Sequence, residues 1–136
     1  PLTPRLLAAL ALSDRGADVV RKLVASGGEK IDRTDAQQMN ALAYALAEGE
    51  VAAAARLLKA GARADALVGQ QPVPVVVIPL MARQFEAIRM LRKAGVDYGR
   101  IRIDGVSVLD TVRRSGDQDL LRALEGGSGK SAAGRA

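Results

Sequence analysis

The amino-acid sequence predicts an all-α fold in which about four helical hairpins stack side by side as a solenoid. The first observation is a glycine that recurs after an apolar, helix-forming segment, because Gly27, Gly61 and Gly95 follow one another at equal intervals. The second is an apolar composition of mainly Ala, Leu and Val, with one Phe, two Tyr and no Trp. Side chains of this kind favour closely packed helices.

The second repeat defines the expected hairpin most clearly. Its sequence predicts a short helix at about 41–47, a tight turn at 48–50 and a longer helix at about 51–60. Gly61 then takes the left-handed backbone conformation that commonly ends a helix. The third repeat continues in the same register, with Phe85 aligned on Val51.

The two outer repeats complete the predicted array. The fourth has its inter-helix turn at Ser115-Gly116-Asp117, and the first has a turn near Asp14-Arg15-Gly16. No single hairpin can bury its apolar face alone, so the hairpins are expected to stack. The predicted repeats span about 3–36, 37–70, 71–104 and 105–125, followed by a flexible tail at 126–136.

The pattern resembles the ankyrin repeat over about residues 3–125. Leu42 and Leu109 fall on the Leu of that family's Thr-Pro-Leu-His start, and Gly49 and Gly116 fall on its turn glycine. "LLKAGARAD" at 57–65 matches its Leu-Leu-x-x-Gly-Ala-Asp ending. The alternative is another α-solenoid, such as a tetratricopeptide array, which has the same period but whose Trp and Gly-Tyr signatures are missing here.

The third repeat departs from this pattern at its first helix. Pro74 and Pro79 are expected to leave that helix kinked, late-starting or partly extended, since proline lacks the backbone donor. Arg83 replaces the turn glycine and adds strain. The sequence leaves two interpretations open. Either the solenoid tolerates one irregular repeat within its stack, or the apolar segment 72–79 forms an exposed rim that docks a partner or a second copy of the chain.

Composition argues against most catalytic chemistry. The chain has no Cys and no His, which excludes disulfides, thiolate nucleophiles, histidine catalysis and nearly all zinc sites. The carboxylates have ordinary explanations, because Asp117 and Asp119 begin a helix, where acidic side chains cap and stabilise the backbone. We therefore expect no enzyme activity, no cofactor and no metal site.

Two further segments are assigned to ordinary roles. The tail "GGSGKS" lacks the first glycine of a phosphate-binding loop, since position 124 is Leu. No apolar stretch is long enough to cross a membrane. The composition is typical of bacterial proteins, and we expect the chain in the cytoplasm, with a periplasmic or secreted location left open.

The resemblance implies a protein-recognition module, such as an adaptor, an inhibitor or an immunity-type binder. Ankyrin repeats contact protein partners through loop tips and the exposed ends of the first helices, which line a concave face. The corresponding positions here are Gln37, Met39, Glu48, Gln70, Gln71, Val73, Met81, Asp104, Val106, Arg114 and Ser115.

The alternative function is binding of an acidic partner or nucleic acid through the basic segment 83–102. The net charge of +5 permits such a partner without requiring one. Against nucleic acid, Tyr98 is the one aromatic residue expected nearby for base stacking, and no groove-reading motif is present. A solvated outer face is the ordinary explanation of these charges. The cations in question are Arg89, Arg92, Lys93, Arg100 and Arg102.

Overall fold

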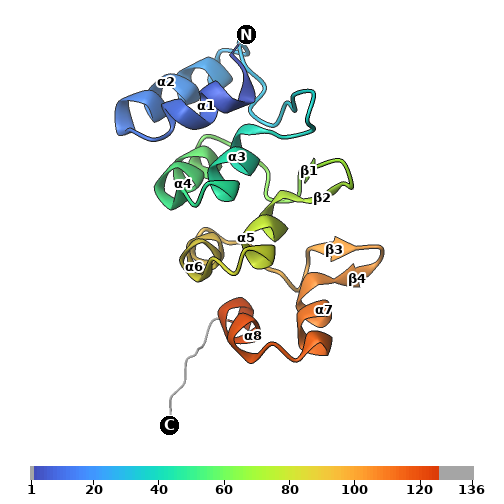
Figure 1. The fold of residues 1–136 in the computed structure, drawn as a ribbon. Helices are drawn as coiled ribbons and strands as arrows, with labels where there is room; N and C mark the ends of the chain where they lie inside the picture. The colour runs from blue at the N-terminus through green and yellow to red at the C-terminus, as the bar shows by residue number, and fades with distance from the viewer. Residues whose placement is uncertain (1, 126–136) are drawn as a thin grey trace. The chain divides into compact units, whose positions relative to one another are not determined.

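The computed structural model describes residues 2–125, and helices make up more than half of them (Figure 1). The predicted tail at 126–136 lies outside the described residues. The chain divides into two compact units, the first ending at Ile78 and the second beginning at Pro79. The predicted predominance of helix is therefore confirmed, and each unit is described by itself.

The first unit contains two helical hairpins followed by a short strand pair. Helix α1 packs against α2 and α3, and α3 packs against α4 (Figure 1). The buried residues of α3, 41–46, form the centre of this unit. Its elements are α1 (Pro4–Leu10), α2 (Asp14–Ala25), α3 (Ala41–Ala47), α4 (Val51–Lys59), β1 (Leu67–Val68), β2 (Val73–Pro74) and the 3-10 helix η1 (Val75–Val77).

The second unit is also built from helices and a short strand pair, but the helices have different lengths. Helix α5 (Ile78–Met81) spans the boundary between the units, and the remaining helices are α6 (Phe85–Lys93), α7 (Val108–Ser115) and α8 (Gln118–Glu125). Both α6 and α7 pack against α8. A second strand pair, β3 (Arg102–Ile103) and β4 (Val106–Ser107), leads directly into α7.

The first helix of three of the four hairpins begins with the same kind of side-chain cap. These helices are α1, α3 and α7. The side chains of Thr3, Asn40 and Ser107 each accept a hydrogen bond from the backbone N–H three residues later. Such a cap satisfies one of the free donors at a helix start and is typically worth about 1 kcal/mol. Pro74 stands at this place before η1 and makes no side-chain cap.

The recurring glycines end the second helices as the sequence predicts. Gly27, Gly61 and Gly95 have positive φ angles of 82°, 111° and 102°. The residue after each glycine donates its backbone N–H to a helix carbonyl five residues earlier, in the pattern of a left-handed helix cap. These hydrogen bonds join Gly28 to Leu23 (2.9 Å), Ala62 to Leu57 (3.0 Å) and Val96 to Leu91 (3.0 Å).

The turn predicted near Asp14-Arg15-Gly16 is wrong. The turn lies at 11–13, Ser13 caps α2, and Gly16 is inside that helix. Helix α2 has 12 residues where α4 has nine, so three additional residues shift the register before Gly27. At Gly16 a Cβ atom would lie 1.9 Å from the carbonyl oxygen of Leu10, so this glycine permits a close helix contact.

The segment 72–79 is distorted as predicted, but it is not an exposed rim. The chain is extended at β2, turns once as a 3-10 helix and reaches α5 only at Ile78. Val75 and Val76 are fully buried, and η1 packs against α3. The valines therefore belong to the core, because burial of branched apolar side chains is worth about 1.5–3 kcal/mol each. Self-association through an apolar rim at 72–79 loses its basis.

Two antiparallel strand pairs, which the all-α prediction did not include, precede η1 and α7. In the first pair Val68 faces Val73 across a turn at 69–72. In the second, Ile103 faces Val106, so the turn consists of two residues, Asp104 and Gly105. Their φ angles of 52° and 82° are those of a type I′ turn, which favours Asp-Gly.

Candidate partner-binding surfaces

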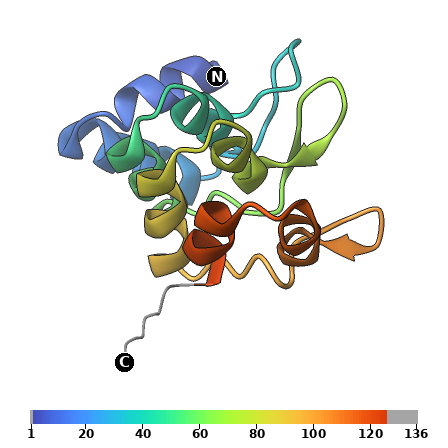
Figure 2. The ribbon, with the colours of Figure 1, turned by 60° about the horizontal axis from the view of Figure 1, so that its bottom comes forward.

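Two loop tips of the first unit lie side by side and project away from its helices (Figure 2). Asp35 holds the earlier tip, because its carboxylate accepts hydrogen bonds from the N–H groups of Gln37 (2.9 Å) and Met39 (3.1 Å). The backbone N–H of Gly69 donates to the carbonyl of Gln38 at 2.8 Å and ties the β1–β2 turn to this tip. These contacts bring together two loops that are far apart in the sequence.

The predicted contact residues of these two tips are accessible. Gln37, Gln70 and Gln71 are exposed, whereas Met39 and Val73 are half-buried. The backbone beneath them is held by the hydrogen bonds of Asp35 and Gly69. The first unit therefore presents amide side chains from two consecutive loops on one fixed backbone.

Tyr44, which is only 6% exposed, connects the earlier loop tip to α1, and the sequence did not single it out. Its hydroxyl donates to the carboxylate of Asp35 and lies 2.9 Å from the side-chain oxygen of Gln37. The guanidinium of Arg5 lies 4.4 Å from the centre of the Tyr44 ring and 3.5 Å from the carboxylate of Glu48. Predicted residues Gln37 and Glu48 thus become members of one network centred on Tyr44.

The pKa shifts in this network follow from the Tyr44 hydrogen bond. That bond is the largest cause that lowers the pKa of Asp35, because it stabilises the carboxylate. The same bond raises the pKa of Tyr44, since the neutral hydroxyl is the donor. A groove of about 100 Å³ lies beside these residues, with Arg5, Ala8, Ala9, Leu12, Tyr44, Ala45, Glu48 and Glu50 as its lining.

The predicted contact residues of the second unit lie at three separate places. Met81, at the end of α5, is 68% exposed. Asp104 and Val106 belong to the β3–β4 hairpin, which extends beyond α7 (Figure 2). Arg114 and Ser115 lie at the end of α7, where the Ser115 hydroxyl donates to the carbonyl of Val112 at 2.6 Å.

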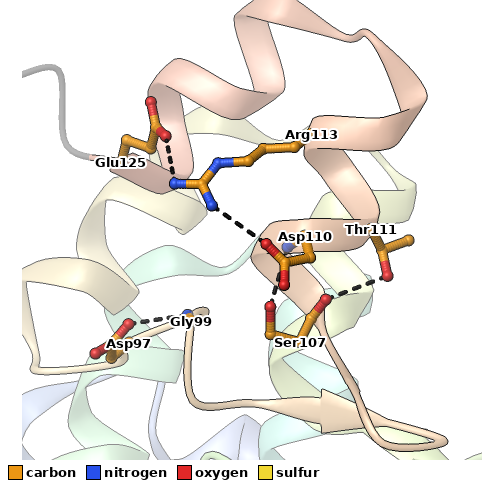
Figure 3. A network of polar contacts seen from close by, with 7 residues as sticks. All are labelled: Asp97, Gly99, Ser107, Asp110, Thr111, Arg113 and Glu125. Atoms are coloured by element: carbon orange, nitrogen blue, oxygen red, sulfur yellow. Dashed lines mark hydrogen bonds and ion pairs between the residues drawn. The ribbon is translucent and has the colours of Figure 1, made fainter.

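A polar network joins the two last helices of the second unit (Figure 3). Arg113 on α7 reaches Asp110 at 3.2 Å and Glu125 on α8 at 3.1 Å. Ser107 caps α7 by accepting from the N–H of Asp110, and its carbonyl accepts from the hydroxyl of Thr111. Arg113 therefore connects α7 and α8, in addition to their apolar contact.

The predicted basic segment separates into two parts. Arg89, Arg92 and Lys93 on α6 line one groove of about 870 Å³, which α8 closes on the other side. Arg100 instead pairs with Asp97 at 3.6 Å, and Arg102 donates to the carbonyl of Gly105 at 3.1 Å. Sequence reasoning did not assign the remaining lining residues to this site, and they are Phe85, Asp119, Arg122 and Ala123.

The carboxylates do not gather into a larger polar centre. Across residues 2–125 no three acidic side chains form a group that could hold a metal ion. Burial raises the pKa of Asp32, which accepts a hydrogen bond from the N–H of Arg63 at 3.0 Å and so fastens two loops. None of the helices described is long and apolar enough to cross a membrane.

No protein-family model matches this chain, and a comparison with the curated proteins gives no match. The functional conclusion therefore rests on the geometry of the two units and on the chemistry of their surfaces.

Proposed function

We propose that this chain is a non-enzymatic protein-recognition module of ankyrin type. Support for the repeat comes from the matched second helices, since α4 and α6 each have nine residues. Their first residues, Val51 and Phe85, are separated by the same interval as Gly61 and Gly95. Each helix ends at a left-handed glycine, and each following loop carries a short strand pair. A short helix, a tight turn and a longer helix that ends at a glycine is the order that the sequence predicts for the second repeat, and α3 and α4 have it.

The observation that carries the binding proposal is the pair of connected loop tips in the first unit. The hydrogen bond from Gly69 to Gln38 and the two that Asp35 accepts fix the backbone beneath Gln37, Gln70 and Gln71. A surface that is ordered before binding loses little conformational entropy on association. The amide side chains can both donate and accept hydrogen bonds, which suits the polar groups of a protein partner.

The side chains of Arg5, Gln37 and Glu48, which surround the buried Tyr44, lie beside the loop tips and extend this surface. Interface hot spots are enriched in Arg, and here the exposed Arg5 is held over the buried Tyr44 ring next to exposed Glu48. We infer that the partner covers the tips of the loops and the exposed ends of α1 and α3. An adaptor, an inhibitor or an immunity-type binder would use such a surface in the same way.

Site-directed photocrosslinking in the source cell tests this function. Benzoylphenylalanine replaces Gln37 or Gln71 at the tips in the full chain, and a third variant carries it at exposed Lys59 on α4. We expect a discrete protein adduct from both tip positions and none from Lys59. Gln37→Arg and Gln71→Arg should then abolish binding of the captured protein, whereas Lys59→Glu should retain it.

The opposite pattern would refute the proposal. If the Lys59 position gives the strongest adduct, or if Gln71→Arg binds the captured protein as tightly as the wild type, the loop tips are not the binding surface. Circular dichroism of each variant controls for folding, since all the changes fall on accessible side chains.

A further inference from the structure

We propose that the groove between α6 and α8 binds an acidic peptide segment of a partner protein. None of its lining residues belongs to the loop tips or to the Tyr44 network, so this site stands independently of the function proposed above. The groove is contained within the second unit, where α6 packs on α8.

The charge of the groove is the first reason. Arg89, Arg92, Lys93 and Arg122 line it against one carboxylate, that of Asp119, which pairs with Arg122 at 3.6 Å. Within residues 2–125 no carboxylate forms an ion pair with Arg89, Arg92 or Lys93. Cations that converge on one concave surface raise the local concentration of an anionic ligand.

The repeat itself does not require these charges. Helix α4 has the same length and register as α6, yet it carries Ala55 and Leu58 where α6 carries Arg89 and Arg92. The buried positions of the two helices match, so the fold tolerates apolar residues on this face. Arg89 and Arg92 are thus an addition to the repeat, whereas Lys93 has a counterpart in Lys59, and an acidic ligand gives the two arginines a role.

The dimensions and the floor of the groove fit a short peptide. Helix α6 has nine residues, which at 1.5 Å per residue gives a groove about 13 Å long. An extended peptide advances about 3.3 Å per residue, so about four residues fit. Phe85 and Ala123, which are both half-buried, add apolar surface to the lining of the groove. The ligand that matches is an acidic segment containing one apolar side chain.

The chemistry of Asp119 favours a peptide over a nucleic acid. A peptide offers backbone N–H donors to this carboxylate, whereas a phosphodiester offers only further negative charge. Arg guanidinium groups bind the carboxylates of a peptide bidentately. Single-stranded nucleic acids also require aromatic platforms for their bases, and Phe85 is the one aromatic side chain that lines the groove.

Fluorescence anisotropy of the full chain with a labelled peptide, Glu-Glu-Leu-Glu-Glu-Leu, tests the site. The control peptide has Gln in place of every Glu. We expect the acidic peptide to bind and its affinity to fall as the salt concentration rises past about 0.15 M. Lys93→Glu and Arg92→Glu should each lower the affinity about tenfold or more, since a repelling charge replaces an attracting one.

The matched control variant is Lys59→Glu. Lys59 occupies on α4 the position that Lys93 occupies on α6, and its replacement changes the net charge by the same amount. It should change the affinity by less than about twofold, because Lys59 lies outside the groove. An equal loss in Lys59→Glu and Lys93→Glu would show general attraction to a basic protein and would overturn the proposal.

Three other outcomes would overturn it as well. The wild type could bind the Glu and Gln peptides equally. An oligothymidylate of equal charge could bind more tightly than the acidic peptide and displace it, which would assign the groove to nucleic acid. Light scattering could show self-association that Lys93→Glu abolishes, which would make a second copy of the chain the occupant.

Discussion

The second and third hairpins have closely matched second helices, α4 and α6, whereas their first helices differ. Helices α4 and α6 have equal lengths, and both bury an Ala, a following apolar residue and a Leu at matched positions. The first helix, in contrast, has seven residues in α3 and four in α5, where a 3-10 turn replaces its start. The second helix with its glycine end is therefore the fixed part of the repeat, and the first helix adapts.

The solvent-facing residues of the same two helices differ in chemistry as well. Helix α4 carries half-buried Ala55 and Leu58 where α6 carries Arg89 and Arg92, and both helices expose a lysine at the same position. A fold that fixes only the buried face leaves the outer face free to acquire binding residues. The matched buried residues are thus what the repeat needs, and Arg89 and Arg92 are what this chain adds to it.

Truncation of the shared leucine should have the largest effect. Leu57→Ala and Leu91→Ala each remove a fully buried side chain at the same repeat position. Each should lower the free energy of unfolding by about 2–5 kcal/mol, measured by urea denaturation. Leu67→Ala, at a residue 61% exposed, should change it by less than about 0.5 kcal/mol. A loss below about 1 kcal/mol for Leu91→Ala alone would show that α6 is not packed as α4 is.

Substitutions in the inter-helix turns should change the free energy of unfolding less strongly, and the two turns should differ from each other. Gly49 and Arg83 hold the same turn position, with φ angles of 72° and 52°. Gly49→Ala should destabilise by about 1–2 kcal/mol, because a Cβ atom disfavours the left-handed conformation. Arg83→Gly relieves that strain but loses the ion pair to Asp117 and the contact 5.1 Å from the Phe85 ring.

In Arg83→Gly the relief of backbone strain and the loss of the two side-chain contacts nearly cancel in the free energy of unfolding. The exposed ion pair and the cation–π contact are each worth about 1 kcal/mol or less, and glycine also gives the unfolded chain more freedom. Arg83→Gly should therefore change the free energy of unfolding by less than about 1 kcal/mol in the same denaturation assay. A stabilisation above that value would mean that the side-chain contacts of Arg83 contribute nothing.

The periodic part of this fold is what the sequence could predict. Glycines at positive φ have a local physical cause, so Gly61 and Gly95 located two helix ends correctly. The turn predicted for the first hairpin was wrong because α2 is three residues longer than α4 at its start, although Gly27 keeps the interval, and Gly16 looked like a turn residue. Buried Val75 and Val76 were misjudged because an apolar run does not reveal which of its sides is covered.

The surfaces were harder to predict than the helices. Tyr44 meets Arg5, and Arg122 joins the cations of α6 in one groove, only after segments far apart in the sequence come together, so local spacing carried no signal for these contacts. The β3–β4 hairpin did carry one, since Asp104 and Gly105 form the dipeptide that favours a two-residue turn. Local chemistry is thus readable from the sequence, whereas side-chain networks depend on packing that a single sequence does not display.

The smallest expected effect is a pH dependence that separates the two partners of Asp117. The backbone N–H of Leu120, at 3.1 Å from the Asp117 carboxylate, is the largest cause that lowers the pKa of Asp117, and Arg83 lowers it further. Because the folded pKa lies below the usual value of 3.8, the charged carboxylate stabilises the fold above that pH. This contribution is lost as the pH falls through the folded pKa.

Asp117→Asn should therefore be less stable than the wild type at neutral pH, and urea titrations at decreasing pH should show the difference shrink as the pH falls through the folded pKa. Arg83→Gln keeps the Leu120 hydrogen bond, so it should retain most of the pH dependence that Asp117→Asn removes. If Arg83→Gln flattens the profile as completely as Asp117→Asn, the ion pair dominates over the helix cap. The left-handed arginine of the third hairpin would then be a stabilising replacement for the turn glycine of the second.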